Sequence, residues 1–310
     1  MAEALDDDDD IFVYMGGDQQ VPDGVRRARI HKDVKIIRAR AFRDRRKLVS
    51  VEFHDGVEII EAEAFYGCLF LRSANKLLGI KIIKRVAFYE CRKLMDVEFG
   101  DQLETIKEQA FQRCDSLKTI RMPSVRTVGR AAFGSCHDLS DVEFGEALRT
   151  LHEAAFTKCR NLKRVVLPLK ENLIGNQVFN QCNRLSKVNL VGGIHNTVVS
   201  LHMESWRSEM MDEINRINQT LPTVGKRGKT EAIKQWMGST FRQLNHILLM
   251  KEAATLLELA LWKANLDNEG GQLEREGVRM TRGRRKRARI ESCVTSGASI
   301  VIKNVLPFLS

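Results

Sequence analysis

The sequence predicts an α+β protein: a solenoid of about seven 22–23-residue repeats plus an N-terminal capping turn, followed by an α-helical hairpin. Two periods support this fold class. One apolar pattern recurs about every 23 residues through the first part of the 310-residue chain, and a second recurs at helical spacing after it. Hydrophobic residues make up 43% of the chain and charged residues 29%, which is typical of a globular protein.

The repeat is anchored by a phenylalanine that recurs at intervals of 22 or 23 residues: Phe42, Phe65, Phe88, Phe111, Phe133, Phe156 and Phe179. A leucine follows each one by six positions, from Leu48 to Leu185, and an aliphatic residue precedes it by five, from Ile37 to Ile174. One turn cannot bury such an apolar wedge alone, so stacked turns must share one core. The alternating end of each repeat predicts a short strand, and A-F-x-x-C predicts a short helical or 3₁₀ turn.

The pattern I-x-x-x-A-F-x-x-C-x-x-L-x-x-V-x-F/L resembles the BspA-like leucine-rich repeats over roughly residues 25–190. Residues 257–266 and 296–309 are similar to the tails of the intracellular diatom-type proteins that carry these repeats and a helical C-terminal tail. The resemblance implies a leucine-rich-repeat solenoid in a eukaryotic intracellular protein. It implies no known activity.

Composition and pattern divide the chain into five predicted parts. They are an acidic disordered N-terminus (1–10), the solenoid (11–195), a helical hairpin (196–266), a basic disordered linker (267–292) and an apolar C-terminal segment (293–310).

Two departures from the repeat carry predictions of their own. Val25 and Ala28 align one period upstream of the first full repeat, so residues 11–30 are expected to form the N-terminal cap. In the second repeat Ala74 and Lys76 occupy positions that should face inward, which predicts a weakened or bulged turn.

The helical hairpin is predicted from two apolar stripes, Val199 to Leu221 and Ile233 to Leu248, whose members recur at spacings of three and four. Pro222 ends the first helix, and Thr230 is the expected N-cap of the second, which should end near Leu266. Residues 253–262 are apolar nearly all round and need cover on more than one side. Two covers are open: the hairpin caps the solenoid, or the helical region forms an oligomer.

Six cysteines stand three positions after a repeat phenylalanine: Cys68, Cys91, Cys114, Cys136, Cys159 and Cys182. A disulfide ladder or a metal ladder is conceivable, but tetrahedral zinc needs four ligands around one point, so buried packing thiols are favoured. His137 beside Cys136 lacks a predictable third partner for catalysis. No phosphate loop or metal-ligand spacing is found, and the sequence predicts neither an enzyme nor a cofactor.

The polar positions of each repeat strand form the candidate protein-binding face. Acidic and basic rows alternate across neighbouring turns: Asp96, Glu98, Lys118, Arg121, Asp141, Glu143, Lys163 and Arg164. Opposite charges on adjacent strands attract, so the face is either self-neutralised and solvated or a polar docking surface for a protein. Aromatic residues are missing from these positions, which disfavours single-stranded nucleic acid as the ligand.

The C-terminal region holds a candidate nuclear-import or nucleic-acid patch: Arg282, Arg284, Arg285, Lys286, Arg287 and Arg289. A solvated linker has the same composition. The leading functional prediction is a non-enzymatic protein–protein interaction scaffold binding an unknown protein, in the cytoplasm or the nucleus. The alternatives are a nuclear protein with weak auxiliary nucleic-acid binding and an adhesin-like surface protein. The acidic start does not resemble a signal peptide and no stretch is apolar enough for a membrane, which disfavours the second alternative.

Overall fold

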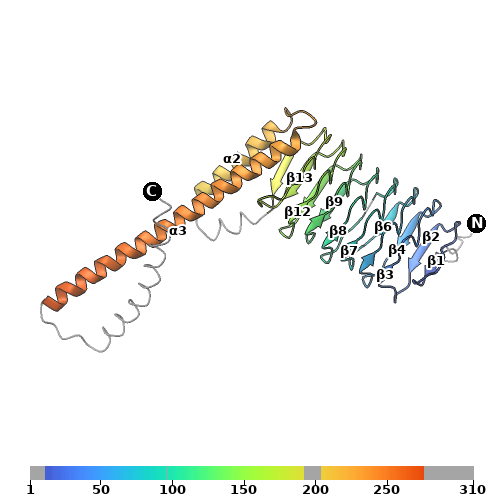
Figure 1. The fold of residues 1–310 in the computed structure, drawn as a ribbon, viewed down its shortest axis with the longest axis horizontal. Helices are drawn as coiled ribbons and strands as arrows, with labels where there is room; N and C mark the ends of the chain where they lie inside the picture. Colours follow the sequence, from blue (N-terminus) through green and yellow to red (C-terminus); the bar gives the residue numbers. More distant parts are fainter. Residues whose placement is uncertain (1–10, 96, 192–203, 276–310) are drawn as a thin grey trace, which may run out of the picture. The chain divides into compact units, whose positions relative to one another are not determined.

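The computed structural model describes residues 11–95, 97–191 and 204–275 (Figure 1). It divides into two units, of which the first ends at Ser239 and the second begins at Thr240. The first unit contains the solenoid and the helical segments that follow it directly. Residues 1–10 and 276–310, predicted as the acidic N-terminus, most of the basic linker and the apolar end, lie outside the described residues.

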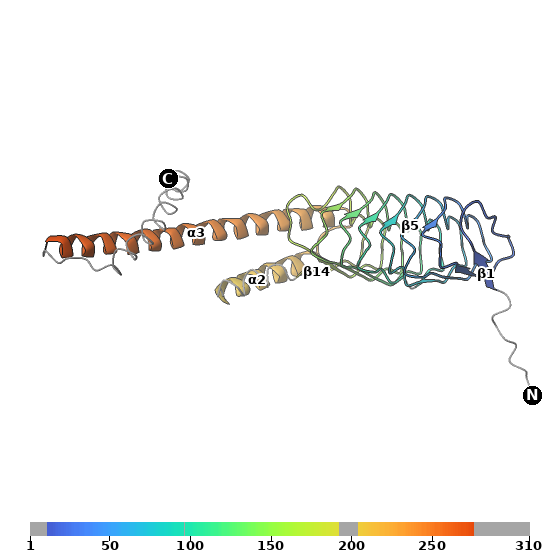
Figure 2. The ribbon, with the colours of Figure 1, turned by 90° about the horizontal axis from the view of Figure 1, so that it is seen from below.

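Within each sheet of the solenoid, neighbouring strands come from neighbouring turns and pair in parallel (Figure 2). Ala28, Val51 and Ala74, for example, are in register across three turns. The two front sheets have the orders β1-β2-β4-β6 and β14-β13-β11-β9. Their strands are β1 (Ile11–Tyr14), β2 (Arg27–Ile30), β4 (Ser50–Glu52), β6 (Ser73–Asn75), β9 (Thr119–Met122), β11 (Asp141–Phe144), β13 (Arg164–Leu167) and β14 (Lys187–Leu190). A bridge between Leu77 and Phe99 lies between the two sheets.

The back sheet has the order β12-β10-β8-β7-β5-β3 and consists of two-residue strands from six successive turns, with a bridge from Leu151 to Ile174 of the turn that follows. They are β3 (Ile36–Ile37), β5 (Ile59–Ile60), β7 (Ile82–Ile83), β8 (Thr105–Ile106), β10 (Thr127–Val128) and β12 (Thr150–Leu151). The predicted leucine-rich-repeat solenoid is therefore confirmed. The capping turn at residues 11–30 is present too, as strands β1 and β2.

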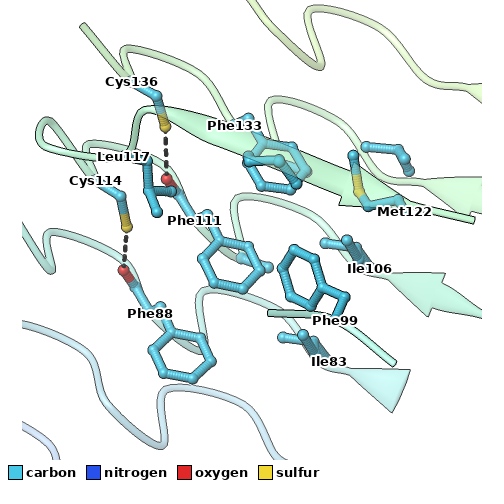
Figure 3. Packing of buried hydrophobic residues seen from close by; sticks show 14 of the residues in the cluster. Ile83, Phe88, Phe99, Ile106, Phe111, Cys114, Leu117, Met122, Phe133 and Cys136 are labelled. Atoms are coloured by element: carbon cyan, nitrogen blue, oxygen red, sulfur yellow. Dashed lines mark hydrogen bonds between the residues drawn. The ribbon is translucent and has the colours of Figure 1, made fainter. Parts of the chain in front are cut away.

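The core is organised by the repeat phenylalanines, whose rings stack from turn to turn (Figure 3). Ring centroids are 4.9 Å apart between Phe65 and Phe88 and 5.2 Å apart between Phe133 and Phe156. These rings have no exposed surface. Because each ring contacts the rings of both neighbouring turns, the turns stabilise one another and no single turn holds a core of its own.

The A-F-x-x-C segments form tight turns, so the predicted helical or 3₁₀ turn is wrong. Each turn places a residue with positive φ two positions before the phenylalanine and another two positions after it, as at Gln109 and Arg113 around Phe111. The backbone N–H of Phe111 donates to the carbonyl of Ala132 in the next turn, at 2.7 Å. Hydrogen bonds between turns thus replace those that a continuous helix would make within the segment.

The second repeat contains the predicted bulge. Lys76 adopts φ +53° and is exposed, whereas Leu77 is fully buried and bridges Phe99. The extra residue directs the lysine outward and brings the next leucine into the core.

The C-terminal end of the solenoid is covered by α2 (Glu204–Thr220) and the first turns of α3 (Lys229–Arg275). The N–H of Val188 in β14 donates to Oδ1 of Asn218 at 2.7 Å, and the N–H of Gln181 donates to the carbonyl of Lys226 at 2.9 Å. The end of α2 and the loop after it thus supply acceptors that a further turn of the solenoid would have supplied. Capping by the hairpin, one of the two predicted covers, is present over this end.

Two residues at the start of α3 complete the cap. Thr230 is not the N-cap, because α3 begins at Lys229. Its Oγ1 instead accepts the N–H of Phe179 at 2.9 Å. The buried ammonium of Lys229 donates to the carbonyls of Asn183, at 3.1 Å, and Leu185, at 2.5 Å. Burial lowers the pKa of Lys229.

In the second unit α3 continues from Thr240 to Arg275, nine residues beyond the predicted end at Leu266. Glu, Gln, Leu and Arg in the sequence of this extension favour helix and outweigh Gly270 and Gly271. The side chains of Leu257, Leu259 and Leu261 are exposed, so the described residues do not supply the expected cover for segment 253–262. Neither α2 nor α3 is long and apolar enough to cross a membrane.

Candidate functional site

Four residues of the candidate protein-binding face form one interstrand network of ion pairs. Arg164 lies 3.1 Å from Asp141 and 3.5 Å from Glu143, and Arg121 lies 3.9 Å from Glu143. The hydroxyl of Ser140 and the guanidinium of Arg164 lower the pKa of Asp141. These charges neutralise one another across β9, β11 and β13, which leaves little net charge for a partner.

The other predicted residues of this face form no ion pair with that network among the described residues, although the charge of Lys163 also lowers the pKa of Asp141. Glu98 is exposed at the gap between the two front sheets, and Asp96 lies outside the described residues. Lys118 and Lys163 are exposed and lie immediately before the front strands, where Ser140 separates them along the column. The two lysines therefore belong to another surface, at the points where the front strands begin.

We call this surface the basic edge. It comprises, in each turn, the residue just before the front strand and the two corner residues that precede the inward leucine of the repeat (Leu48 to Leu185) or Val25 of the capping turn. It carries ten exposed cationic side chains: Arg26, Arg46, Lys47, Arg72, Arg92, Lys93, Lys118, Arg160, Lys163 and Arg184. Its carboxylates, among the described residues, are Asp23, Asp115 and Asp138.

Two of these three aspartates already have partners. Asp23 lies 2.9 Å from Arg45, and Asp115 accepts a hydrogen bond from, or pairs with, Nδ1 of His137 at 2.8 Å. Two of the ten cations act on a carboxylate: Arg92 lies 3.2 Å from Glu90, and the charge of Lys163 lowers the pKa of Asp141. The other eight form no ion pair within the part of the chain that the structure describes. Sequence reasoning missed this surface because it grouped Lys118 and Lys163 with the strand residues that follow them and did not consider the corner positions. Aligning the same position of successive repeats would have revealed the column of cations.

The basic edge is hollowed near the N-terminal end of the solenoid. A pocket of about 590 Å³ is lined by Gly24, Arg26, Arg46, Lys47, Val49, Phe70 and Arg72. Phe70 is 54% exposed, which is unusual for an aromatic residue in a protein with a continuous core. We call this site the cationic pocket.

The six repeat cysteines are free thiols buried in the core, as predicted. Each Sγ donates to the carbonyl of a phenylalanine in the preceding turn, for example Cys114 to Phe88 at 3.2 Å (Figure 3). Burial raises the pKa of the Cys68 thiol to about 12 and the pKa of Cys91 well above its usual value. A thiol that stays protonated is a poor nucleophile. Cys136 donates to Phe111 and not to His137.

No group of three or more histidine, cysteine or acidic side chains arranged for a metal ion exists among the described residues. The cationic patch predicted from Arg282 to Arg289 lies outside them. The described surface thus offers charge and shape for binding.

Stacked turns of about 23 residues, each with a front strand and an inward phenylalanine, define a leucine-rich-repeat solenoid. The chain belongs to the family described as "BspA type Leucine rich repeat region", whose model matches residues 24–124 and 81–203 in six copies. No curated protein matches the chain.

Solved leucine-rich-repeat proteins of bacteria are similar to it. The protein TpLRR of T. pallidum is 26% identical over 58% of this chain and 86% of its own, with a TM-score of 0.49. A leucine rich cell surface protein of Faecalibacterium prausnitzii is 27% identical over 58% of this chain and 47% of its own, with a TM-score of 0.45. A leucine-rich repeat protein of Bacteroides ovatus is 18% identical over 58% of this chain and 63% of its own, with a TM-score of 0.35.

Proposed function

We propose that the protein is a non-enzymatic interaction scaffold whose basic edge binds an acidic segment of a partner protein. The observation behind this proposal is the excess of ten exposed cations over three aspartates along one edge of the solenoid. Such an array attracts a polyanion at long range and orients it before contact. The self-neutralised network at Arg121, Asp141, Glu143 and Arg164 would then form the border of the bound surface.

An acidic polypeptide fits this edge better than a nucleic acid. Phe70 is the one aromatic side chain among the edge positions described, so successive bases would find no row of rings on which to stack. Equivalent residues of neighbouring turns follow the strand spacing of about 4.8 Å, which is comparable to the spacing of side chains along an extended peptide. A peptide crossing the turns can therefore place carboxylates beside successive cations.

The remaining parts of the proposal rest on the sequence. The basic run Arg282 to Arg289 supports a nuclear role with auxiliary nucleic-acid binding as the second candidate. We place the protein inside the cell, in the cytoplasm or the nucleus, and among the diatom-type members of the family, on the strength of its terminal segments.

The test is binding of a fluorescein-labelled deca-glutamate peptide to the full chain, measured by fluorescence anisotropy. A variant with Lys118→Ser, Arg160→Ser and Lys163→Ser should weaken binding at least tenfold. The matched control replaces three exposed cations beside the back sheet, Lys35, Lys107 and Arg149, with serine and keeps the net charge equal. An equal loss of peptide affinity in both variants would mean that only the overall charge of the protein matters, and it would refute the proposed site. Tighter binding of a single-stranded oligonucleotide than of the peptide would favour the second candidate.

A further inference from the structure

The cationic pocket lies where strands β2, β4 and β6 begin. Arg26, Val49 and Arg72 directly precede these three strands. Backbone hydrogen bonds join them from turn to turn: the N–H of Val49 donates to the carbonyl of Arg26, and the N–H of Arg72 donates to the carbonyl of Val49. Arg46 and Lys47 lie on the adjoining corner. None of the four cationic side chains forms an ion pair within the described part of the chain, and none of the lining residues is acidic.

Four unpaired cations around one hollow repel one another, and an anionic ligand would relieve that repulsion. Phe70 adds an apolar surface at the side of the hollow. The methylene groups of an acidic side chain, or a flat ring of the ligand, could pack against it. The pocket therefore selects for an anionic ligand with some apolar surface, and the length of three strand starts suits a peptide.

The register of the first strand identifies a segment of this chain that can reach the pocket. Ile11 of β1 pairs in parallel with Arg27 of β2. The chain therefore enters β1 from the same edge of the sheet at which Arg26 precedes β2. The segment that we consider begins with the residue before Ile11. That residue is Asp10, the last of five consecutive aspartates that begin at Asp6.

The dimensions allow the run to cross the whole pocket. From β1 to β6 there are three strand spacings, or roughly 14 Å at about 4.8 Å each. Five extended residues span up to roughly 17 Å. A run that turns across the strand starts can thus place carboxylates near Arg26 and Arg72 at opposite ends, with Lys47 between them.

We propose that the cationic pocket is a binding site for an acidic peptide segment, and that the Asp6–Asp10 run of the same chain is its resident occupant. This inference rests on the proposed function, because an acidic partner segment would compete with the run for the same end of the basic edge. A tethered segment acts at an effective concentration on the order of 1 mM. If the run itself binds the pocket with an intrinsic dissociation constant of about 100 µM, a free peptide binds about tenfold more weakly to the occupied pocket than to an empty one.

The direct test is zero-length carbodiimide cross-linking of the intact chain, followed by mass spectrometry. This reagent joins a carboxylate to an amine only when the two are in contact. We expect a cross-link between Lys47 and the Asp6–Asp10 run, and none between that run and Lys118 or Lys163, which are equally exposed on the same edge. Absence of the Lys47 cross-link, or equal cross-linking to all three lysines, would overturn the proposed occupancy.

The second test replaces Asp6–Asp10 with five asparagines and measures binding of a fluorescein-labelled penta-aspartate peptide. Affinity should rise about tenfold and should fall again when Arg26, Lys47 and Arg72 are also replaced with serine. The asparagine substitutions lie before the first strand, so the fold is retained. Unchanged affinity, or a gain that persists after the pocket is removed, would contradict the inference. Preference of the asparagine variant for a single-stranded oligonucleotide would overturn the peptide assignment.

The two proposals fail in different ways. A specific Lys47 cross-link without any binding of deca-glutamate would sustain the resident segment and refute the partner site along the edge. Binding of deca-glutamate through Lys118, Arg160 and Lys163 without a Lys47 cross-link would support the partner site along the edge and refute the resident segment.

Discussion

The six buried thiols predict that the protein loses stability steeply in mild alkali. An unfolded cysteine releases its proton near its ordinary pKa of 9.0, whereas burial raises the pKa of each repeat thiol in the folded state. The folded state therefore keeps protons that the unfolded state releases. As the pH rises above 9, the free energy of unfolding must fall.

The size of the effect depends on the unfolded pKa alone, as long as the folded thiol stays protonated. At one pH unit above 9.0, each such thiol costs about 1.4 kcal/mol, and six cost about 8 kcal/mol. Domains of this size are stable by about 5–15 kcal/mol. Tyr14, whose pKa burial also raises, adds to the loss at higher pH, while Lys229, whose pKa is lowered, acts in the opposite direction as a single group. We expect unfolding between about pH 10 and 11.

The assay is urea denaturation followed by circular dichroism at several pH values from 8 to 10.5, with a reductant present. Between pH 9.5 and 10.5 the slope should correspond to about six protons, or about 8 kcal/mol per pH unit. The double variant Cys91→Ala/Cys114→Ala lowers stability at every pH, but its slope should drop to about four protons. A wild-type slope below about two protons, or a slope that the double variant leaves unchanged, would refute the reasoning.

Three further predictions concern the backbone and the cap, all measured as the free energy of unfolding in urea at pH 7.5. Lys229→Met should cost about 2–4 kcal/mol, because it removes the donor from the carbonyl of Leu185, in a buried contact, and from that of Asn183; an unchanged stability would mean that the cap does not need the ammonium. Gly145→Ala should cost at least about 2 kcal/mol, since its Cβ would lie 2.0 Å from the carbonyl oxygen of Pro123. Ala131→Gly should be neutral within about 1 kcal/mol, because Ala131 has φ +50°, whereas Ala132→Gly should be clearly destabilising; equal losses would contradict the assigned conformations.

The repeat made the solenoid predictable, because phenylalanine and leucine at fixed spacing determine which side chains share a core. The period even located the bulge at Lys76 and the capping turn at Ala28. The tight turn around Phe111 was not predictable in the same way. Positive φ at Gln109 and Arg113 follows from hydrogen bonds between turns, which no local propensity encodes. The end of α3 was missed because the apolar pattern that predicted the helix ends near Leu266, and the mostly polar residues after it carry no apolar stripe.

The candidate site was harder to predict than the fold, because its charges come together only after the turns stack. Arg121, Asp141, Glu143 and Arg164 were expected to alternate, and the observed distances favour their mutual neutralisation. Lys118 and Lys163 were grouped with them, yet they lie in a column whose other members, such as Arg26 and Arg72, the strand pattern did not single out. The binding surface of a repeat protein is formed by equivalent positions of stacked repeats. Its charge is therefore predicted by comparing the same position across repeats, and not by comparing neighbouring positions within one repeat.

The residues at the two ends of the solenoid bear on the basic edge. A stack of parallel strands exposes unpaired backbone groups at both ends, and such edges recruit other chains. At the C-terminal end, the carbonyl of Lys226, the carboxamide of Asn218 and the hydroxyl of Thr230 take up the donors of the last turn. At the N-terminal end β1 is the outermost strand of its sheet, and five aspartates directly precede it. Two such ends brought together would repel each other, and the same aspartates are opposite in charge to the four cations of the cationic pocket. One acidic run can therefore oppose edge-to-edge pairing and also occupy the cationic pocket. Its replacement by asparagine should both open the pocket and increase self-association. Light scattering of the same samples measures the self-association.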